Sequence, residues 1–210
     1  MKKELVLVFQ KNEVLGKVKT RLAAGLGETQ ALEIYRQLLD KTYFALRDIS
    51  VPIWTYFSDF IPENPTYPAG NRMVQVGQDL GERMKNAFAE NFESGMEKVV
   101  LIGTDCPSLE GKHIIQAIEA LDQSDLVLGP ARDGGYYLIG MSRRADFLFE
   151  GITWSSEWVL SQTLALAAEQ GLQTSLLPVL EDIDTLEDWE RYCSQIGDMP
   201  YLSSSQQMNT

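Results

Sequence analysis

Short apolar runs alternate along the chain with longer segments in which apolar side chains recur every three or four residues. The runs "ELVLVF", "KVVLIG" and "DLVLGP" are continuous, which is typical of strands that are buried on both faces of a parallel sheet. The longer segments have the spacing of amphipathic helices, as between Ile34 and Leu46. This alternation predicts an α/β fold with a mainly parallel sheet flanked by helices.

The same pattern gives the approximate place of each element. Predicted strands cover residues 4–9, 51–57, 72–76, 98–103, 125–130, 135–141 and 172–180, with 98–103 as the strongest candidate for a central strand. Predicted helices cover residues 29–48, 80–95, 111–121, 155–171 and, after an acidic turn, the end of 182–196. Thr185 is the expected N-cap of that last helix. Residues 58–71 are rich in proline and are expected to be irregular.

Length, composition and charge narrow the choice of partners. With 210 residues, of which 44% are hydrophobic, the chain can bury one sizeable core. We expect one domain over residues 1–196 and a polar tail over residues 197–210. The net charge is −12. Because nucleic acids and anionic membranes attract clustered positive charge, we expect neither as a partner.

Cysteine spacing and the N-terminus point to a cytoplasmic protein. Cys106 and Cys193 lack the spacing of a metal site or a redox motif, so both are expected to be reduced, structural thiols. The apolar run at residues 5–9 is too short for a signal peptide, and no segment has the length needed to cross a bilayer. His113 is the single histidine and is predicted on a helix, which argues against thiol catalysis at Cys106.

A basic segment stands out in this acidic chain. The stretch "GKVKTRLAAGLG" carries alternating cations and lacks the residue order of a P-loop. Cations gathered here can offset the charge of phosphate oxygens, and small residues allow a close approach of the backbone. The alternative is a solvated loop whose cations balance nearby acids. The residues that we expect at an anionic ligand are Lys11, Gly16, Lys17, Lys19, Thr20 and Arg21.

Three predicted strands are each followed at once by a polar segment. The basic segment follows "LVLVF", the segment "TDCPSL" follows "VVLIG", and "ARDGGYY" follows "LVLGP". If these strands are parallel, all three segments emerge at one edge of the sheet, where open α/β folds bind their ligands. This convergence is the main reason to expect a binding site there.

Aspartates in these segments are the candidates for chemistry. Asp105 lies just past a buried strand, where a carboxylate can hold Mg²⁺ or Mn²⁺ while the metal bridges two phosphates; its alternative role is turn capping. Asp133 precedes Gly134 and Gly135, which would let a ligand lie against the backbone, unless the segment is an ordinary turn. In "DIDT", Asp184 can complete the metal site, whereas a solvated acidic turn is the favoured interpretation of Asp182.

Two further segments have open roles. Glu82 and Arg83 begin a predicted helix, where an N-terminus suits phosphate and Glu82 suits the helix dipole. The loop "GITWSS" is expected to close over the ligand edge with Trp154, although core packing is the more frequent use of tryptophans such as Trp154 and Trp158.

The motifs resemble a known family. "KVKTRLAAGLG", "DLGERMKNAF", "IGTDCPSL", "GPARDGGYYLIG", "ITWSSEWVL" and "DIDTLEDW", in this order, are similar to those of the bacterial glycosyltransferase-like proteins of the nucleotide-diphospho-sugar transferase superfamily, a family associated with arsenosugar biosynthesis. The resemblance implies a GT-A fold, a Rossmann-like sandwich that binds nucleotide with a divalent metal. The chain departs from the family at Glu13 and Leu15, where prolines are usual.

Two reactions fit these residues. In a glycosyltransferase that uses a nucleotide-sugar donor, metal on Asp105 and Asp184 would neutralise the leaving nucleoside diphosphate, and Asp133 would orient or deprotonate a hydroxyl of a small-molecule acceptor. In a nucleotidyltransferase, Lys19 and Arg21 would hold the departing pyrophosphate. The basic segment and the single aspartate of "TDCP" favour the second reaction, and the family favours the first, which we rank ahead. A non-catalytic nucleotide-binding module is the third possibility.

Overall fold

The computed structural model describes residues 3–67 and 70–197. Its strands are β1 (Glu4–Gln10), β2 (Ile53–Phe57), β3 (Arg72–Val74), β4 (Lys98–Ile102), β5 (Leu126–Pro130), β6 (Tyr136–Met141) and β7 (Thr174–Leu176). Its helices are α1 (Thr20–Leu26), α2 (Glu28–Leu46), α3 (Leu80–Glu93), α4 (Gly111–Ala120), α5 (Val159–Glu169) and α6 (Leu186–Ile196), with a 3-10 turn η1 (Asp146–Phe149). Of the predicted tail at residues 197–210, residues 198–210 lie outside the described residues.

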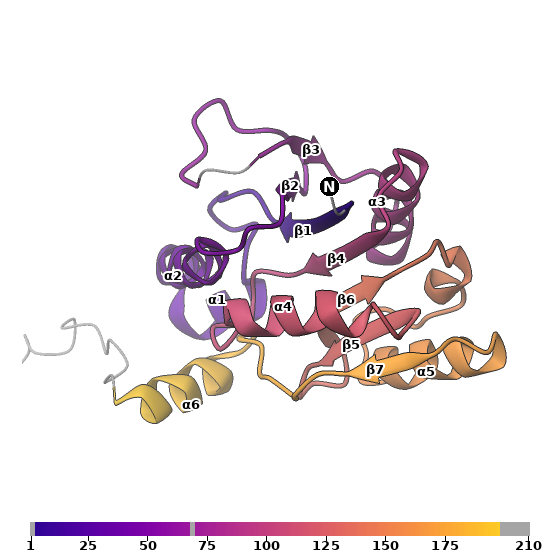
Figure 1. Ribbon diagram of the computed structural model, residues 1–210. Coiled ribbons are helices and arrows are strands. Elements are labelled where there is room, and N and C mark those ends of the chain that lie inside the picture. The colour runs from indigo at the N-terminus through magenta and orange to yellow at the C-terminus, as the bar shows by residue number, and fades with distance from the viewer. Residues whose placement is uncertain (1–2, 68–69, 198–210) are drawn as a thin grey trace, which may run out of the picture.

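All seven strands form one sheet in the order β3-β2-β1-β4-β6-β5-β7, with the strongest predicted central strand, β4, in the middle (Figure 1). Strand β6 runs antiparallel to its neighbours β4 and β5, and the other pairs are parallel. Strands β1, β4, β5 and β7 therefore point the same way. This confirms the mainly parallel α/β sheet and brings the segments after all four strands to one edge.

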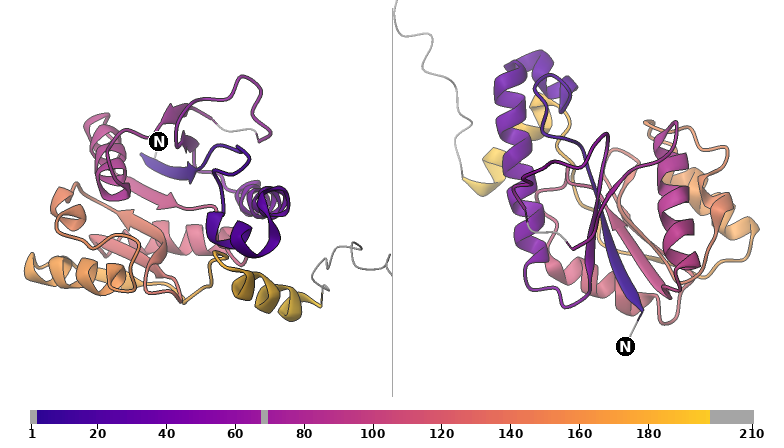
Figure 2. Two further views of the ribbon diagram at one scale, coloured as in Figure 1. Left: turned by 180° about the vertical axis from the view of Figure 1, so that it is seen from behind. Right: turned by 90° about the horizontal axis from the view of Figure 1, so that it is seen from above.

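Helices cover both faces of the sheet, as Figure 2 shows from above, with α2 on one side and α3 and α5 on the other. Alternate residues of the central strands supply the two cores. Leu5 and Leu7 of β1 pack with α3, η1 and α5, whereas Val6 and Val8 pack with α4 and the end of α2. A third cluster joins α1, α2 and α6 around Leu22 and Ile183. In the described residues, no helix is long and apolar enough to span a membrane.

Three elements differ from their prediction. Helix α1 was not predicted, because seven residues between two turns are too few to show a helical period. Helix α5 begins at Val159 instead of 155, because the residues before it form a turn with Ser155 in the left-handed conformation at φ 59°. Strand β7 covers only Thr174–Leu176. Leu177 N–H still donates to the carbonyl of Leu128 at 2.9 Å, but the next residue of β5 in the ladder, Pro130, has no N–H to donate back.

Candidate functional site

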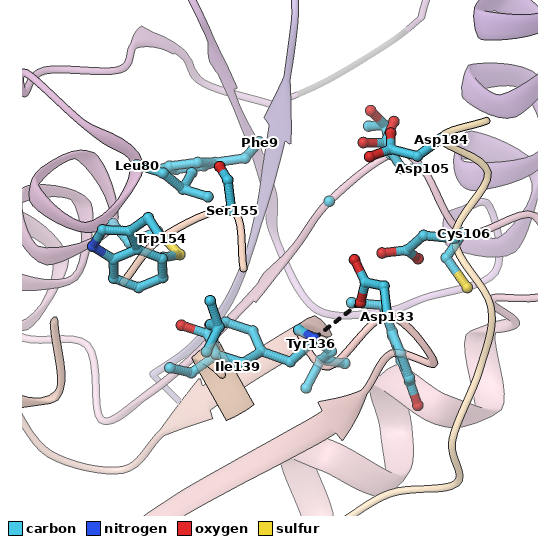
Figure 3. A pocket seen from close by; sticks show the side chains of 18 of the residues that line it. Phe9, Leu80, Asp105, Cys106, Asp133, Tyr136, Ile139, Trp154, Ser155 and Asp184 are labelled. Atoms are coloured by element: carbon cyan, nitrogen blue, oxygen red, sulfur yellow. Dashed lines mark hydrogen bonds between the residues drawn. The ribbon is translucent and has the colours of Figure 1, made fainter. Parts of the chain in front are cut away.

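A cavity of about 460 Å³ opens at the edge where β1, β4 and β5 end. The segments after these strands line it, together with Asp182, Asp184 and the loop at residues 154–157. Figure 3 shows two chemically different ends, with Asp105, Asp133 and Asp184 at one and Trp154 at the other. The predicted convergence of the strand ends is thus realised in the structure.

The charged end is acidic, with cations at its rim. Four carboxylates line the cavity there: Asp105, Asp133, Asp182 and Asp184. Lys11 and Arg21 are exposed and line the same cavity. Nη1 of Arg21 lies 3.6 Å from Oδ2 of Asp184, and the Arg21 side chain is 67% exposed. Because exposed ion pairs are weak, Arg21 is free to turn toward an anionic ligand.

Asp182 is the most unusual of these carboxylates. Its Oδ1 is buried and has no hydrogen-bond partner in the protein. Burial, and then the negative charge of Asp105 and Asp133, raises the pKa of Asp182 to about 7. The favoured interpretation of Asp182 as part of a solvated turn is therefore wrong.

The backbone explains how Asp182 reaches this position. Leu180 N–H donates to the carbonyl of Pro130 at 3.0 Å, and Ile183 N–H donates to the carbonyl of Asp105 at 2.9 Å. The segment after β7 is thereby attached first to the end of β5 and then to the end of β4. The side chain of Ile183 is fully buried, so its neighbours in the extended "DID" run both face the cavity.

Lys19 lies behind the carboxylates instead of at the ligand surface. Its ammonium is 2.7 Å from Asp105 Oδ1 and 3.3 Å from Asp184 Oδ1, and its side chain is 3% exposed. Burial alone would lower the pKa of Lys19, but Asp105 and then Asp184 outweigh it and raise that pKa. Lys19 is absent from the cavity lining. Its donors contact protein oxygens in this structure, so the expected contact of Lys19 with phosphate stays an untested prediction.

The segment after β5 forms the floor of the charged end. Asp133 lines the cavity, and its Oδ1 accepts a hydrogen bond of 2.9 Å from the N–H of Gly135, which also lines it. Gly134 has φ 89°, and a Cβ there would overlap the backbone of Glu157. Gly134 is therefore required for packing against the loop before α5, and its expected role at a ligand stays an untested prediction.

The other end of the cavity is apolar and aromatic. Its lining comes from β1, β6, α3 and the loop before α5, and includes Phe9, Leu80, Met84, Tyr136, Ile139 and Trp154. Trp154 lies against Gly81 in the first turn of α3. Lys19 and Ser155 are the non-glycine residues with positive φ in the described chain. Ser155 lines the cavity, and Lys19 contacts Asp105 and Asp184, which line it. Such strained residues cluster at functional sites.

Several predicted residues lie away from the cavity. Gly16, Lys17, Thr20, Glu82 and Arg83 do not line it. Glu82 accepts from the N–H of Gln78 at 2.7 Å, and Arg83 donates to the carbonyl of Gly77 at 3.2 Å, so both hold the turn before α3. Their proposed roles in nucleotide binding stay untested predictions.

The remaining candidates have structural roles. Cys106 is buried, and burial raises the pKa of its thiol, which makes a thiolate nucleophile unfavourable. His113 is buried and its Nδ1 accepts from the N–H of Glu110 at 3.0 Å, as part of the cap of α4. Trp158 is 57% exposed, so core packing is the wrong interpretation for that residue.

Known proteins share this architecture. A family model described as "Uncharacterized protein conserved in bacteria (DUF2064)" matches residues 58–156. A candidate nucleotide-diphospho-sugar transferase from Desulfovibrio desulfuricans G20 is 30% identical, and the match covers 100% of this chain and 92% of that one with a TM-score of 0.86. The chain belongs to the nucleotide-diphospho-sugar transferase family. Membership places it among the transferases and confirms the family and fold that the motifs imply.

More distant members of the nucleotide-diphospho-sugar transferase fold are also similar. The 4-diphosphocytidyl-2C-methyl-D-erythritol synthase from Anaerococcus prevotii DSM 20548 is 13% identical over 93% of this chain and 99% of that chain, with a TM-score of 0.60. Rv0371c from Mycobacterium tuberculosis H37Rv, in complex with manganese, is 14% identical over 90% and 96%, with a TM-score of 0.55. At these identities the likeness concerns the fold alone. No curated protein matches the chain.

Proposed function

We propose that this transferase uses a nucleotide-sugar donor with a divalent metal ion, and that it transfers the glycosyl group to a small-molecule acceptor. The observation that carries the proposal is the unpaired, buried Oδ1 of Asp182 among three further carboxylates that line one cavity. Only Lys11 and Arg21 provide lining cations among the described residues. A diphosphate would be repelled by such a lining unless a cation bound with it.

The carboxylates suit Mg²⁺ or Mn²⁺. Among the described residues, no three acidic, histidine or cysteine side chains form a complete metal cage. Mg²⁺ is usually held by one or two carboxylates together with substrate phosphates and water, so a partial protein site is what this chemistry requires. Asp105 and Asp184 would supply the protein oxygens, with Asp182 beside them in the cavity lining. A bound metal would neutralise the charge that develops on the departing nucleoside diphosphate.

The other residues of the cavity have separate tasks. Lys11 and Arg21 are exposed at the rim and would bind the phosphate oxygens by charge-assisted hydrogen bonds. Asp133 keeps one carboxylate oxygen occupied by Gly135, so its other oxygen would orient or deprotonate the acceptor hydroxyl. The apolar end around Trp154 would hold an uncharged part of the ligands, because no lysine or arginine of the described residues lines that end to bind a second phosphate.

Nucleotidyl transfer is the second candidate. The position of Arg21 at the rim favours it, since an arginine there can hold a departing pyrophosphate. A triphosphate needs more positive charge than a nucleotide sugar, however, and the burial of Lys19 removes one of the cations on which this reading depended. We therefore keep glycosyl transfer first.

One screen separates the two reactions. The protein is incubated with nucleotide sugars, or with nucleoside triphosphates and sugar phosphates, in Mg²⁺, in Mn²⁺ and in chelator, and the release of nucleoside diphosphate and of pyrophosphate is measured separately. The proposal predicts metal-dependent release of nucleoside diphosphate from a nucleotide sugar, and its loss in Asp105→Asn. Release of pyrophosphate alone would favour nucleotidyl transfer, and equal release in chelator would contradict the role of the metal.

A further inference from the structure

The ammonium of Lys19 lies where a metal ion would be expected between two carboxylates. It contacts Asp105 Oδ1 at 2.7 Å, Asp184 Oδ1 at 3.3 Å and the carbonyl oxygen of Ile183 at 2.5 Å. Two carboxylates and one backbone carbonyl are an oxygen set typical of hard divalent cations. The structure thus has a lysine in a cation-binding position built from the end of β4 and the segment before α6.

The backbone of Lys19 indicates that this position is specifically maintained. Lys19 has φ 48° and ψ 46°, the left-handed conformation that side chains other than glycine rarely adopt. It is also the N-cap of α1, where its carbonyl accepts from the N–H of Ala23 at 2.8 Å. The start of α1 therefore directs the side chain inward, toward residues more than 80 positions away in the sequence. A solvated loop lysine would need no such conformation.

The contacts of Lys19 leave room for one more cation. Lys19 uses Oδ1 of Asp105 and Oδ1 of Asp184, so the second oxygen of Asp105 remains available. Asp182 Oδ1 is buried and has no protein partner. Sites that bind two metal ions hold them about 3.5–4 Å apart between shared carboxylates. In this chain the ammonium would occupy one of two such positions.

We propose that Lys19 is a permanent internal cation that replaces one metal ion, so that the site binds a single divalent ion and keeps Asp105 and Asp184 in place for it. The part that concerns the remaining divalent ion rests on the proposed function. Lys19 is a positioning residue in this account, because it is shielded from the cavity by the carboxylates that it holds.

The test is the number of Mn²⁺ ions bound by the full chain, measured by titration calorimetry and by electron paramagnetic resonance of free Mn²⁺. Wild type is expected to bind one ion. Lys19→Met, which removes the ammonium, is expected to bind a second ion, and Lys19→Arg, which keeps the charge, should bind one. Lys17→Met is the matched control, since it removes an exposed cation from the same segment that does not line the cavity. It should bind as wild type does.

The possible outcomes distinguish the inference about Lys19 from the metal dependence of the proposed function. If Lys19→Met binds one ion with wild-type affinity, or if wild type already binds two, the inference about Lys19 is overturned while metal dependence stands. If wild type binds none and Lys19→Met binds one, Lys19 does occupy the cation position, and the divalent ion of the proposed function must bind together with the phosphates of the ligand. If neither binds Mn²⁺, the inference about Lys19 is overturned, and metal dependence is decided by the nucleotide titrations in Mn²⁺ and in chelator.

The folding stability of the Lys19 variants, with and without Mn²⁺, is a second measurement that tests the proposal. Lys19→Gln retains a donor for the carbonyl of Ile183 and is used if Lys19→Met does not fold. Variants that are destabilised in chelator and restored by Mn²⁺ would support the proposal, because a metal then takes the place of the ammonium. If Lys19→Met and Lys19→Gln both stay unfolded in saturating Mn²⁺, the position does not accept a metal and the proposal is overturned.

Discussion

Gly81 lies directly under the indole of Trp154, and a Cβ at position 81 would overlap the ring. We predict that Gly81→Ala displaces the indole toward the cavity and lowers the free energy of unfolding by about 1–3 kcal/mol, as measured by urea denaturation. Gly25→Ala is the control, because its Cβ would meet only the flexible side chain of Leu186.

A variant of Trp154 tests whether the cost of Gly81→Ala comes from its contact with the indole. In Trp154→Leu the smaller side chain leaves space, so Gly81→Ala should cost little more in that background, and the two changes should not be additive. Additive effects on the free energy of unfolding would show that the packing of the indole does not require a glycine at position 81.

Arg21 and Lys17 differ in function although both are exposed cations of one segment. Arg21→Gln should weaken nucleotide binding about ten- to a hundredfold, because it removes a charge-assisted phosphate contact of about 1.5–3 kcal/mol. The loss should grow from nucleoside monophosphate to diphosphate in calorimetric titrations. Lys17→Gln, outside the cavity lining, should leave these affinities unchanged. Equal losses in both variants would point to general electrostatic attraction.

Much of the fold, and part of the candidate site, could be predicted from the pattern of apolar and polar residues along the chain. The runs that form β1, β4 and β5 are continuous and apolar, so both their burial and the edge where they end could be predicted. Asp105 and Asp133, each three residues past the end of β4 or β5, could be predicted at this edge, and both line the cavity. Their place at the cavity depends only on strand direction.

The remaining features depend on contacts between distant parts of the chain. The ion pair between Lys19 and Asp184 spans 165 positions, so no local pattern distinguishes Lys19 from the exposed Lys17. The burial of Asp182 results from backbone bonds to the ends of β4 and β5. The alternation of Asp182 and Asp184 in "DIDT" is the only sequence signal that could have indicated that the Asp182 side chain faces the cavity.

Asp182 is expected to destabilise the protein when no cation is bound. Its carboxyl has a pKa raised to about 7, so at pH 8 it is mostly charged while its Oδ1 is buried without a protein partner. In chelator at this pH, Asp182→Asn should raise the free energy of unfolding by about 1–2 kcal/mol, or roughly 2–8 °C in Tm. Asp133→Asn, at an exposed residue, should change stability little. A lower Tm for Asp182→Asn would contradict this account of the carboxyl.

His113 gives a clean pH dependence because it is the single histidine. Burial, and then the charge of Lys112, lowers its pKa below the ordinary 6.5. Between the lowered pKa and 6.5 the unfolded chain binds more protons than the folded one, so the His113 contribution lowers stability as pH falls below about 6.5. His113→Gln should remove this part of the loss. An NMR titration that gives His113 a pKa of 6.5 or higher would contradict the prediction.

The central claim is that nucleotide binding at the aspartate cluster requires a divalent metal. Titration calorimetry of wild type and Asp105→Asn with nucleoside diphosphates, in Mn²⁺ and in chelator, tests it most directly. We predict that Mn²⁺ strengthens binding to wild type by about tenfold or more, and that Asp105→Asn loses most of this gain while its affinity in chelator stays close to wild type. Equal losses of affinity in Mn²⁺ and in chelator would contradict the claim.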